Sequence, residues 1–184
     1  MEKVRAFIAI DFPDEVVKEI ARVQEVFGNK QFTGKMTELE NLHLTLKFLG
    51  EIEAEKVEEV RSALREIKFG KFEARLAEAG TFNHRGKPSI VWIKVGGEGI
   101  FDLQSAVDLA VEKCGFKKEK RFMSHLTIAR VKYVKDKKDF VGYVKRLGVR
   151  DVKFNVGGFK LMRSELQPMG PVYTVVEEFE LKEK

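Results

Sequence analysis

The chain of 184 residues has little cysteine, proline, tryptophan or histidine: one, four, one and three residues respectively. Cys114 has no second cysteine to pair with, so an intramolecular disulfide and a thiolate metal cage are both excluded. No stretch approaches the roughly 18 consecutive apolar residues of a membrane-spanning helix, and no signal-peptide pattern precedes the first apolar segment. We therefore expect a cytoplasmic protein with no membrane partner.

Several motifs of nucleotide and acyl chemistry are also missing. The sequence has no Walker-type glycine-rich loop, no Gly-x-Ser-x-Gly turn and no dinucleotide-binding fingerprint. Its charge is mildly basic, with 34 Lys and Arg against 29 Asp and Glu and a net charge of +5. An anionic partner therefore fits better than a cationic one, although so small an excess selects no partner by itself.

The chain does contain a repeated histidine motif. His-Leu-Thr-Leu at 43–46 recurs as His-Leu-Thr-Ile at 125–128, 82 positions later, which accounts for two of the three histidines. Each copy lies in an apolar run, where the alternation of a strand points the histidine and the threonine to the same face. This pattern predicts a symmetric site in which two imidazoles meet one phosphate.

The motif belongs to a longer repeat, roughly 5–82 and 89–162, followed by a strand at 172–181. Because each copy reads β-α-β-α-β and no flexible linker divides them, we expect 1–184 to form a single compact α+β domain of two pseudo-symmetric lobes. Antiparallel or mixed sheets would face a central cleft, with the helices outside. The expected strands are 5–10, 42–49, 72–76, 90–95, 122–131, 152–156 and 172–181, and the expected helices present apolar faces at Val16–Phe27, Val57–Ile67, Leu103–Cys114 and Phe140–Leu147.

Paired histidines suit proton transfer at a phosphate. Because histidine titrates near neutral pH, one imidazolium can protonate a leaving oxygen while a neutral imidazole activates the attacking group. Thr45 and Thr127 could donate hydrogen bonds to the non-bridging oxygens. A lone strand histidine is usually satisfied by its neighbours, and threonine is common in strands, so the functional interpretation depends on the matched setting of both copies.

A zinc site is the competing interpretation of the two histidines. No third ligand stands at a fixed spacing, and no Asp or Glu lies within two residues of His43 or His125. We therefore expect neither a metal nor any other cofactor. Covalent catalysis through Cys114 is also disfavoured, because this residue falls on the apolar face of an expected helix.

Two cations follow the histidines along the same strands. Arg130 lies five residues after His125, so a regular strand would point it away from the histidine face unless a bend or bulge turns it. It is a candidate substrate contact, with a surface ion pair as the alternative. Lys47 lies four residues after His43, shares its face and could meet the phosphate, although a solvent-exposed lysine at a strand end fits at least as well.

His84 stands in a polar turn-like segment, 83–88, where solvent exposure is the simpler interpretation. As an alternative, this basic loop and the segment 163–171 would rim the cleft and grip a polyanion. Phe82 and Trp92 could stack on a base, but Trp92 fits the core better.

Taken together, these residues resemble the two-histidine phosphoesterases, and within them the RNA 2′,3′-cyclic phosphodiesterases first described as 2′-5′ RNA ligases. The resemblance spans the chain and uses segments 5–10, 41–50, 91–92, 124–130, 163–166 and 170–173. One departure is Met123-Ser124 before the second motif, where many relatives have a proline.

The resemblance implies hydrolysis of a terminal 2′,3′-cyclic phosphate of RNA to a 2′-phosphomonoester. His43 would be the proton donor to the leaving 3′ oxygen, His125 the base that activates water, and Thr45 and Thr127 the phosphate ligands. The spacing alone does not tell which histidine is the acid. The expected substrates are RNA ends, including tRNA fragments, or small cyclic nucleotides.

Two other functions stay open from the sequence. The same groups running backward would join RNA ends through a 2′-5′ linkage. Outside the enzyme class, a non-catalytic nucleotide- or RNA-binding module could use the same groove, although binding alone has no need of two groups that titrate near neutrality. In either case we expect a monomer.

Overall fold

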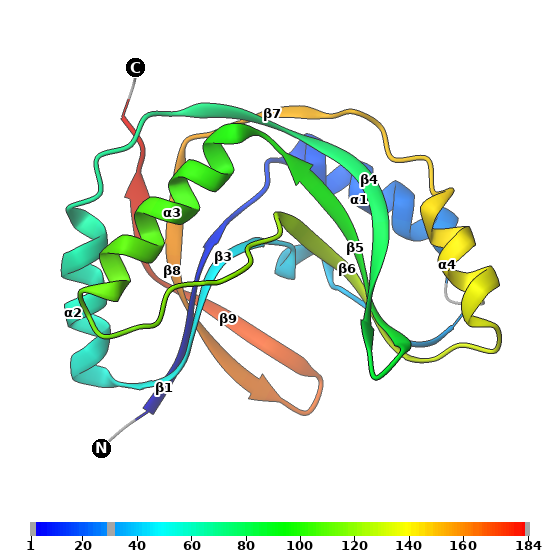
Figure 1. Ribbon diagram of the computed structural model, residues 1–184, viewed down its shortest axis with the longest axis horizontal. Coiled ribbons are helices and arrows are strands. Elements are labelled where there is room, and N and C mark those ends of the chain that lie inside the picture. The colour runs from blue at the N-terminus through cyan, green and yellow to red at the C-terminus, as the bar shows by residue number, and fades with distance from the viewer. Residues whose placement is uncertain (1–2, 29–31, 183–184) are drawn as a thin grey trace.

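The computed structural model describes residues 3–28 and 32–182, which form an α+β fold (Figure 1). Its strands are β1 (Lys3–Ile10), β2 (Thr33–Met36), β3 (Leu44–Glu53), β4 (Phe72–His84), β5 (Lys87–Gly96), β6 (His125–Tyr133), β7 (Lys153–Val156), β8 (Gly158–Gln167) and β9 (Gly170–Glu180). Its α-helices are α1 (Asp14–Phe27), α2 (Ala54–Arg65), α3 (Glu98–Glu112) and α4 (Lys137–Lys145), and a short 3-10 helix covers Leu39–Asn41. The predicted fold class is confirmed.

The strands form one curled antiparallel sheet in the order β7-β4-β5-β6-β3-β1-β8-β9, and β2 pairs with β6. We call β3, β1, β8 and β9 the β1 half of the sheet, and β6, β5, β4 and β7 the β5 half. The two halves are joined where Leu44 of β3 pairs with Leu126 of β6. The residues after each of the two histidines therefore meet at the middle of the sheet.

Helices from both halves of the sequence cover each half of the sheet. In Figure 1, α2 and α3 lie together beside the β1 half, whereas α1 and α4 lie together on the opposite side of the molecule. The hydroxyl of Tyr143 on α4 donates to the carbonyl of Val26 on α1 over 3.0 Å, and Gln24 on α1 reaches the carbonyl of Ile128 on β6 over 3.0 Å. The two copies of the repeat are thus intertwined.

The first helix shows how the sequence builds these layers. Its apolar positions Val16, Ile20 and Val23 recur at helical spacing and are at most 1% exposed. Full burial of such a side chain stabilises the fold by about 1.5–3 kcal/mol. The helix ends where Gly28 adopts a φ of +59°, a conformation that favours glycine. The predicted helix face is confirmed.

The structure confirms one expected loop as a turn and corrects the other. Segment 163–171, expected to be the equivalent of the 83–88 loop, belongs mostly to the β8–β9 hairpin, because the polar residues that follow Met162 hid the strand pattern. Segment 83–88 is the end of the β4–β5 hairpin, where Arg85 and Gly86 both have a positive φ, as in a type I′ turn.

Among the described residues, no helix is long and apolar enough to cross a membrane.

Candidate active site

The two histidine strands have the same environment residue by residue. From His43 to Glu51, and again from His125 to Tyr133, burial follows one sequence: half-buried, buried, half-buried, buried, buried, exposed, buried, exposed, exposed. A regular strand would alternate throughout, so two successive buried positions mark a break in the alternation. Both copies of the repeat therefore carry the same break.

That break is a bulge three residues after each histidine. Along the β1–β3 pair, Leu46 is skipped between Thr45 and Lys47, and along the β5–β6 pair, Ile128 is skipped between Thr127 and Ala129. An extra residue in one strand turns the side chains that directly follow it to the opposite face. The face that carries each histidine and threonine is therefore continued by the fifth residue after the histidine, which is Phe48 in one strand and Arg130 in the other.

The bulge determines in which direction the side chains of Arg130 and Lys47 point. Arg130 is exposed and borders the same cavity as the histidines, because the bulge turns it towards them. Lys47 was expected to share the face of His43, and that prediction is wrong. Lys47 borders the cavity, but its side chain is 5% exposed and its ammonium pairs with Asp108 on α3 at 2.5 Å.

Both histidines and both threonines border one cavity of about 430 Å³. Because the strands run antiparallel through the Leu44–Leu126 pair, His43 lies on the side of Thr127, and His125 on the side of Thr45. The cavity is completed by Lys35, Met36, Thr37, Glu38, Asn41, Leu46, Lys47, Phe48, Ile90, Glu119, Arg121, Phe122, Met123, Arg130, Gly170, Pro171 and Tyr173. The structure thus brings together two imidazoles, two hydroxyls and the guanidinium of Arg130.

Each imidazole is oriented by a backbone carbonyl two residues earlier, just before the strand begins. The Nδ1 atom of His43 lies 2.8 Å from the carbonyl of Asn41, and the Nδ1 atom of His125 lies 2.7 Å from the carbonyl of Met123. A carbonyl only accepts hydrogen bonds, so Nδ1 carries the proton in both rings. The Nε2 atom of each ring is left to accept a proton when neutral or to donate one when charged.

The two rings differ in their aromatic neighbours. The ring of His43 packs against those of Phe7 and Tyr173, with ring centroids 4.9 and 5.2 Å away, and these two rings also contact each other at 5.1 Å. His125 meets Phe82 edge-on at 4.8 Å. No pattern in the sequence indicates the contacts of Phe7 and Tyr173 with His43, because β1 and β9 are distant from His43 along the chain. A strand-pairing prediction would have been needed to find them.

Burial governs the titration of both histidines. It lowers the pKa of His43 below its ordinary value near 6.5, and the positive charges of Arg130 and His125 lower that pKa further. The hydrogen bond to Asn41 and the carboxylate of Asp11 act in the opposite direction. Burial likewise lowers the pKa of His125, against the hydrogen bond to Met123. Without an anion in the cavity, both imidazoles therefore favour the neutral form.

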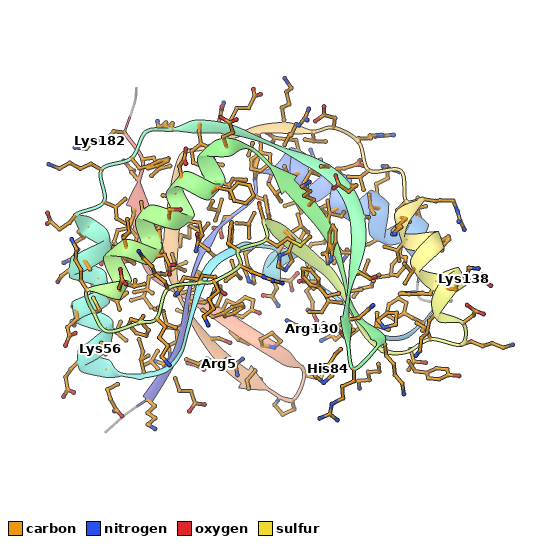
Figure 2. All side chains as sticks on the ribbon, in the orientation of Figure 1. Arg5, Lys56, His84, Arg130, Lys138 and Lys182 are labelled. Carbon is orange, nitrogen blue, oxygen red and sulfur yellow. The ribbon has the colours of Figure 1, made fainter. Side chains whose placement is uncertain are left out.

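The remaining candidates lie away from the cavity. His84 is exposed at the end of the β4–β5 hairpin (Figure 2) and does not border the cavity, whereas Arg130 does. Trp92 packs against Phe82, and its ring fills the space that a side chain at Gly80 would need. This packing fits a core role for Trp92 and leaves Phe82 as a support for His125.

The segment that leads into the second motif is anchored by a serine. Ser124 is 2% exposed, and its hydroxyl donates to the carbonyl of Val95 on β5 over 2.6 Å. The carbonyl of Ser124 in turn accepts from the amide of Val95. These two bonds fix the start of β6.

The described residues contain no grouped metal ligands and no cysteine at the cavity. Among residues 3–28 and 32–182, no three His, Cys, Asp or Glu side chains are grouped as metal ligands. Burial, as well as the nearby carboxylate of Glu59, raises the pKa of the Cys114 thiol. A raised pKa keeps the thiol protonated, and Cys114 does not border the cavity.

Known proteins resemble this chain over nearly its whole length. The curated RNA 2′,3′-cyclic phosphodiesterase of Methanocaldococcus jannaschii is 34% identical over 177 residues, which cover 96% of this chain and 100% of that protein. The protein of the same name from Methanothermobacter thermautotrophicus is 34% identical over 185 residues, covering 97% and 100%.

Solved structures and a family model agree with these matches. The crystal structure of TT0787 of Thermus thermophilus has a TM-score of 0.84 at 31% identity and covers 98% of this chain and 99% of that one. E. coli LigT complexed with 3′-AMP shares the fold, with a TM-score of 0.79 at 23% identity over 99% of this chain and 100% of that one. The model of LigT-like phosphoesterases matches residues 10–92 and 94–173. Each matched segment contains one histidine motif, and together they span most of the sequence, so the chain belongs to the LigT-like phosphoesterase family.

Proposed function

We propose that this protein hydrolyses the 2′,3′-cyclic phosphodiester at the end of an RNA to a 2′-phosphomonoester, through two-histidine acid–base catalysis without a metal ion. The observation that carries the proposal is the convergence of two imidazoles, each with its Nε2 unoccupied by the backbone, on one cavity that two threonine hydroxyls also border. Relatives named for this activity match the chain from end to end.

The reaction divides the work between the two rings. Water attacks the phosphorus on one side while the bond to the 3′ oxygen breaks on the other. His125 accepts the proton of the water, and His43 donates a proton to the departing 3′ oxygen, an assignment that follows the family resemblance. Each positioned proton-transfer group contributes typically about 10²–10⁴-fold in rate. The 2′ oxygen keeps its bond to phosphorus, so the product is the 2′-phosphomonoester.

The charge that builds on the phosphate oxygens needs hydrogen-bond donors. Thr45 and Thr127 supply hydroxyls from the two sides of the cavity, and Arg130 supplies a guanidinium that the bulge has turned into it. A phosphate anion held there also raises the pKa of each imidazole, against the lowering by burial. Binding thus prepares His43 to carry the proton that it donates.

A turnover assay tests the proposal directly. The protein is mixed with a 2′,3′-cyclic nucleotide in the presence of EDTA, and the two isomeric monophosphates are separated by chromatography. We expect the 2′ isomer, at a rate that the chelator does not change. His84→Ala is the matched control, because His84 is the one histidine outside the cavity. Turnover that disappears with EDTA, or that survives the loss of both cavity histidines, contradicts the mechanism.

The same assay separates the two rival functions. A binding module would hold the cyclic nucleotide tightly and leave it intact. Ligation would join an RNA that ends in a 2′,3′-cyclic phosphate to one with a 5′-hydroxyl, because hydrolysis and ligation differ only in whether water or a hydroxyl attacks. A gel that resolves the joined product measures ligation.

A further inference from the structure

Behind one wall of the cavity, Lys47 and Asp108 form a buried ion pair. Their side chains are 5% and 8% exposed, and the ammonium lies 2.5 Å from one carboxylate oxygen. The ammonium also donates to the carbonyl of Lys117 over 2.6 Å, and the other carboxylate oxygen accepts from the amide of Glu119 over 2.8 Å. Two buried charges thus connect β3, α3 and the segment that follows α3.

That segment, 117–121, has no regular secondary structure of its own. The backbone hydrogen bonds that fasten it to other described residues are the two made with Lys47 and Asp108. It leads directly into the second histidine strand, and it contributes Glu119 and Arg121 to the cavity. The position of this part of the wall therefore depends on the ion pair.

Arg121 is the cation that this wall presents. It is exposed, borders the cavity and makes no hydrogen bond or ion pair with any other residue that the structure describes. It stands four residues before His125, outside the two strands that carry the motifs and Arg130. Its guanidinium is thus available to an anionic group other than the phosphate between the histidines.

We infer that Lys47 and Asp108 are positioning residues: their ion pair fixes segment 117–121, so that Arg121 meets a second phosphate of an RNA substrate. The inference rests on the proposed function, because an RNA strand supplies the additional phosphates. It assigns to Lys47 a role behind the cavity wall in place of direct contact with the reacting phosphate.

A purely structural role explains this pair less well. The second copy of the repeat has Ala129 where the first has Lys47, and Ala129 is fully buried without any charge. Burying two charges costs desolvation that an apolar pair avoids, so stability alone would favour apolar residues at both places. An apolar pair, however, cannot hydrogen-bond the backbone of Lys117 and Glu119. The charges thus provide the anchoring rather than the packing.

Hydrogen exchange measures the anchoring without any substrate. The variant Lys47→Met with Asp108→Leu replaces both charges by apolar groups and leaves neither unpaired, so we expect it to fold. Exchange of the Glu119 amide should become about tenfold faster or more, because its acceptor is lost. The amide of Arg150, which donates to the carboxylate of Glu19 over 2.8 Å, is the matched control and should exchange as before.

Steady-state kinetics then measure the consequence for binding. The same double variant should raise KM for an oligonucleotide with a 2′,3′-cyclic end about tenfold, while KM for a 2′,3′-cyclic mononucleotide rises less and kcat falls far less. Arg121→Met should give the same split between the substrates. Glu119→Gln removes a negative charge from the wall and should shift KM for the oligonucleotide downward. Lys120→Met removes the same charge from a neighbour that does not border the cavity, and is the control for net charge.

Three results overturn the inference: unchanged exchange of the Glu119 amide, an equal rise of KM for both substrates, or an effect of Lys120→Met as large as that of Arg121→Met. A wild-type protein that turns over neither substrate contradicts the proposed function instead. In that case exchange of the Glu119 amide still tests whether the ion pair anchors segment 117–121. The affinity for the labelled oligonucleotide, measured by fluorescence anisotropy, then takes the place of KM. Equal affinity of wild type and double variant would then count against the role of the ion pair.

Discussion

The strands that follow the two histidines, β3 and β6, have the same backbone geometry but carry different side chains after the bulge. Both bind their histidine to the carbonyl two residues earlier, both follow it with a threonine, and both bulge one residue after that threonine. After the bulge the residues diverge, to Lys47 and Phe48 in one strand and to Ala129 and Arg130 in the other. The backbone geometry of the two motifs is the same, while the positions after the bulge differ in their contacts.

The same bulge serves both tasks. It turns the fourth residue after the histidine towards the helices and the fifth towards the cavity. In β3 this buries Lys47, which anchors a loop, and exposes Phe48 at the cavity. In β6 it buries the small Ala129 and presents Arg130. One backbone feature thus provides a scaffold position in each strand and a cavity position in each strand.

The largest expected effect tests whether the two strands are equivalent in catalysis. His43→Ala and His125→Ala should each lower kcat by about 10²–10⁴-fold, because each removes one proton-transfer group. The double variant should lose much less than the product of the two losses, since groups that act as one unit are not additive. Single-turnover hydrolysis of a cyclic nucleotide measures this, and unequal single losses would show that the reaction breaks the symmetry.

Replacing each threonine compares the contributions of the two hydroxyls, each of which would donate one hydrogen bond to the phosphate. Thr45→Val and Thr127→Val each remove a donor to a charged oxygen, worth about 1.5–3 kcal/mol, or about 10–150-fold in kcat/KM. Valine keeps the shape and the strand preference of threonine, so the fold should hold. Losses that are equal within a few-fold fit a phosphate centred between the strands. A loss confined to one variant would place the phosphate against one strand.

Arg130 places a positive charge on one side of the cavity, where the first copy of the repeat has Phe48. Arg130→Met should lower kcat/KM about tenfold through the lost charge-assisted hydrogen bond. It also removes a positive charge that lowers the pKa of His43, so that pKa rises. If His43 is the acid, it stays protonated to a higher pH, and the alkaline limb of the kcat/KM profile moves upward. A shift of the acidic limb alone would instead assign His43 as the base.

The smallest effect concerns the glutamines that hold the two bulges. Gln24 on α1 donates to the carbonyl of Ile128 over 3.0 Å and to that of Thr37 over 2.9 Å, whereas Gln104 on α3 donates to the carbonyl of Leu46 over 3.5 Å. Gln24→Leu should lower the free energy of unfolding by about 1–2 kcal/mol, and Gln104→Leu by about 1 kcal/mol or less. Urea denaturation measures both, and the reverse order would show that burial of Gln104 outweighs its long bond.

Local patterns in the sequence predicted what depends on local geometry. The alternation in 43–46 placed His43 and Thr45 on one face, and the helical spacing from Val16 to Phe27 gave the buried face of α1. Gly28 marked the end of that helix. The recurrence of the motif indicated a shared site, because two matched histidines in one chain have no simpler explanation.

Other features depend on contacts that no local pattern records. The bulge after Thr45 follows from pairing with β1 and from a glutamine on α3, so straight-strand periodicity put Lys47 on the wrong face. For Arg130, sequence analysis allowed a bulge as the exception, and the structure has that bulge. The partner of Lys47, Asp108, stands 61 residues away along the chain, and β8 is recognised as a strand only from its pairing with β1 and β9.

The pairing of β8 with β1 has a consequence for the history of the chain. The strand that flanks β1 comes from the end of the second copy, whereas β4, the corresponding strand of the first copy, flanks β5. A polypeptide with a single copy would expose an unpaired edge and a strand without a neighbour. Two such polypeptides could satisfy both needs by exchanging that strand. The arrangement is what gene fusion of a domain-swapped homodimer would leave behind, and cutting the chain in the turn between β4 and β5 should yield fragments that fold only together.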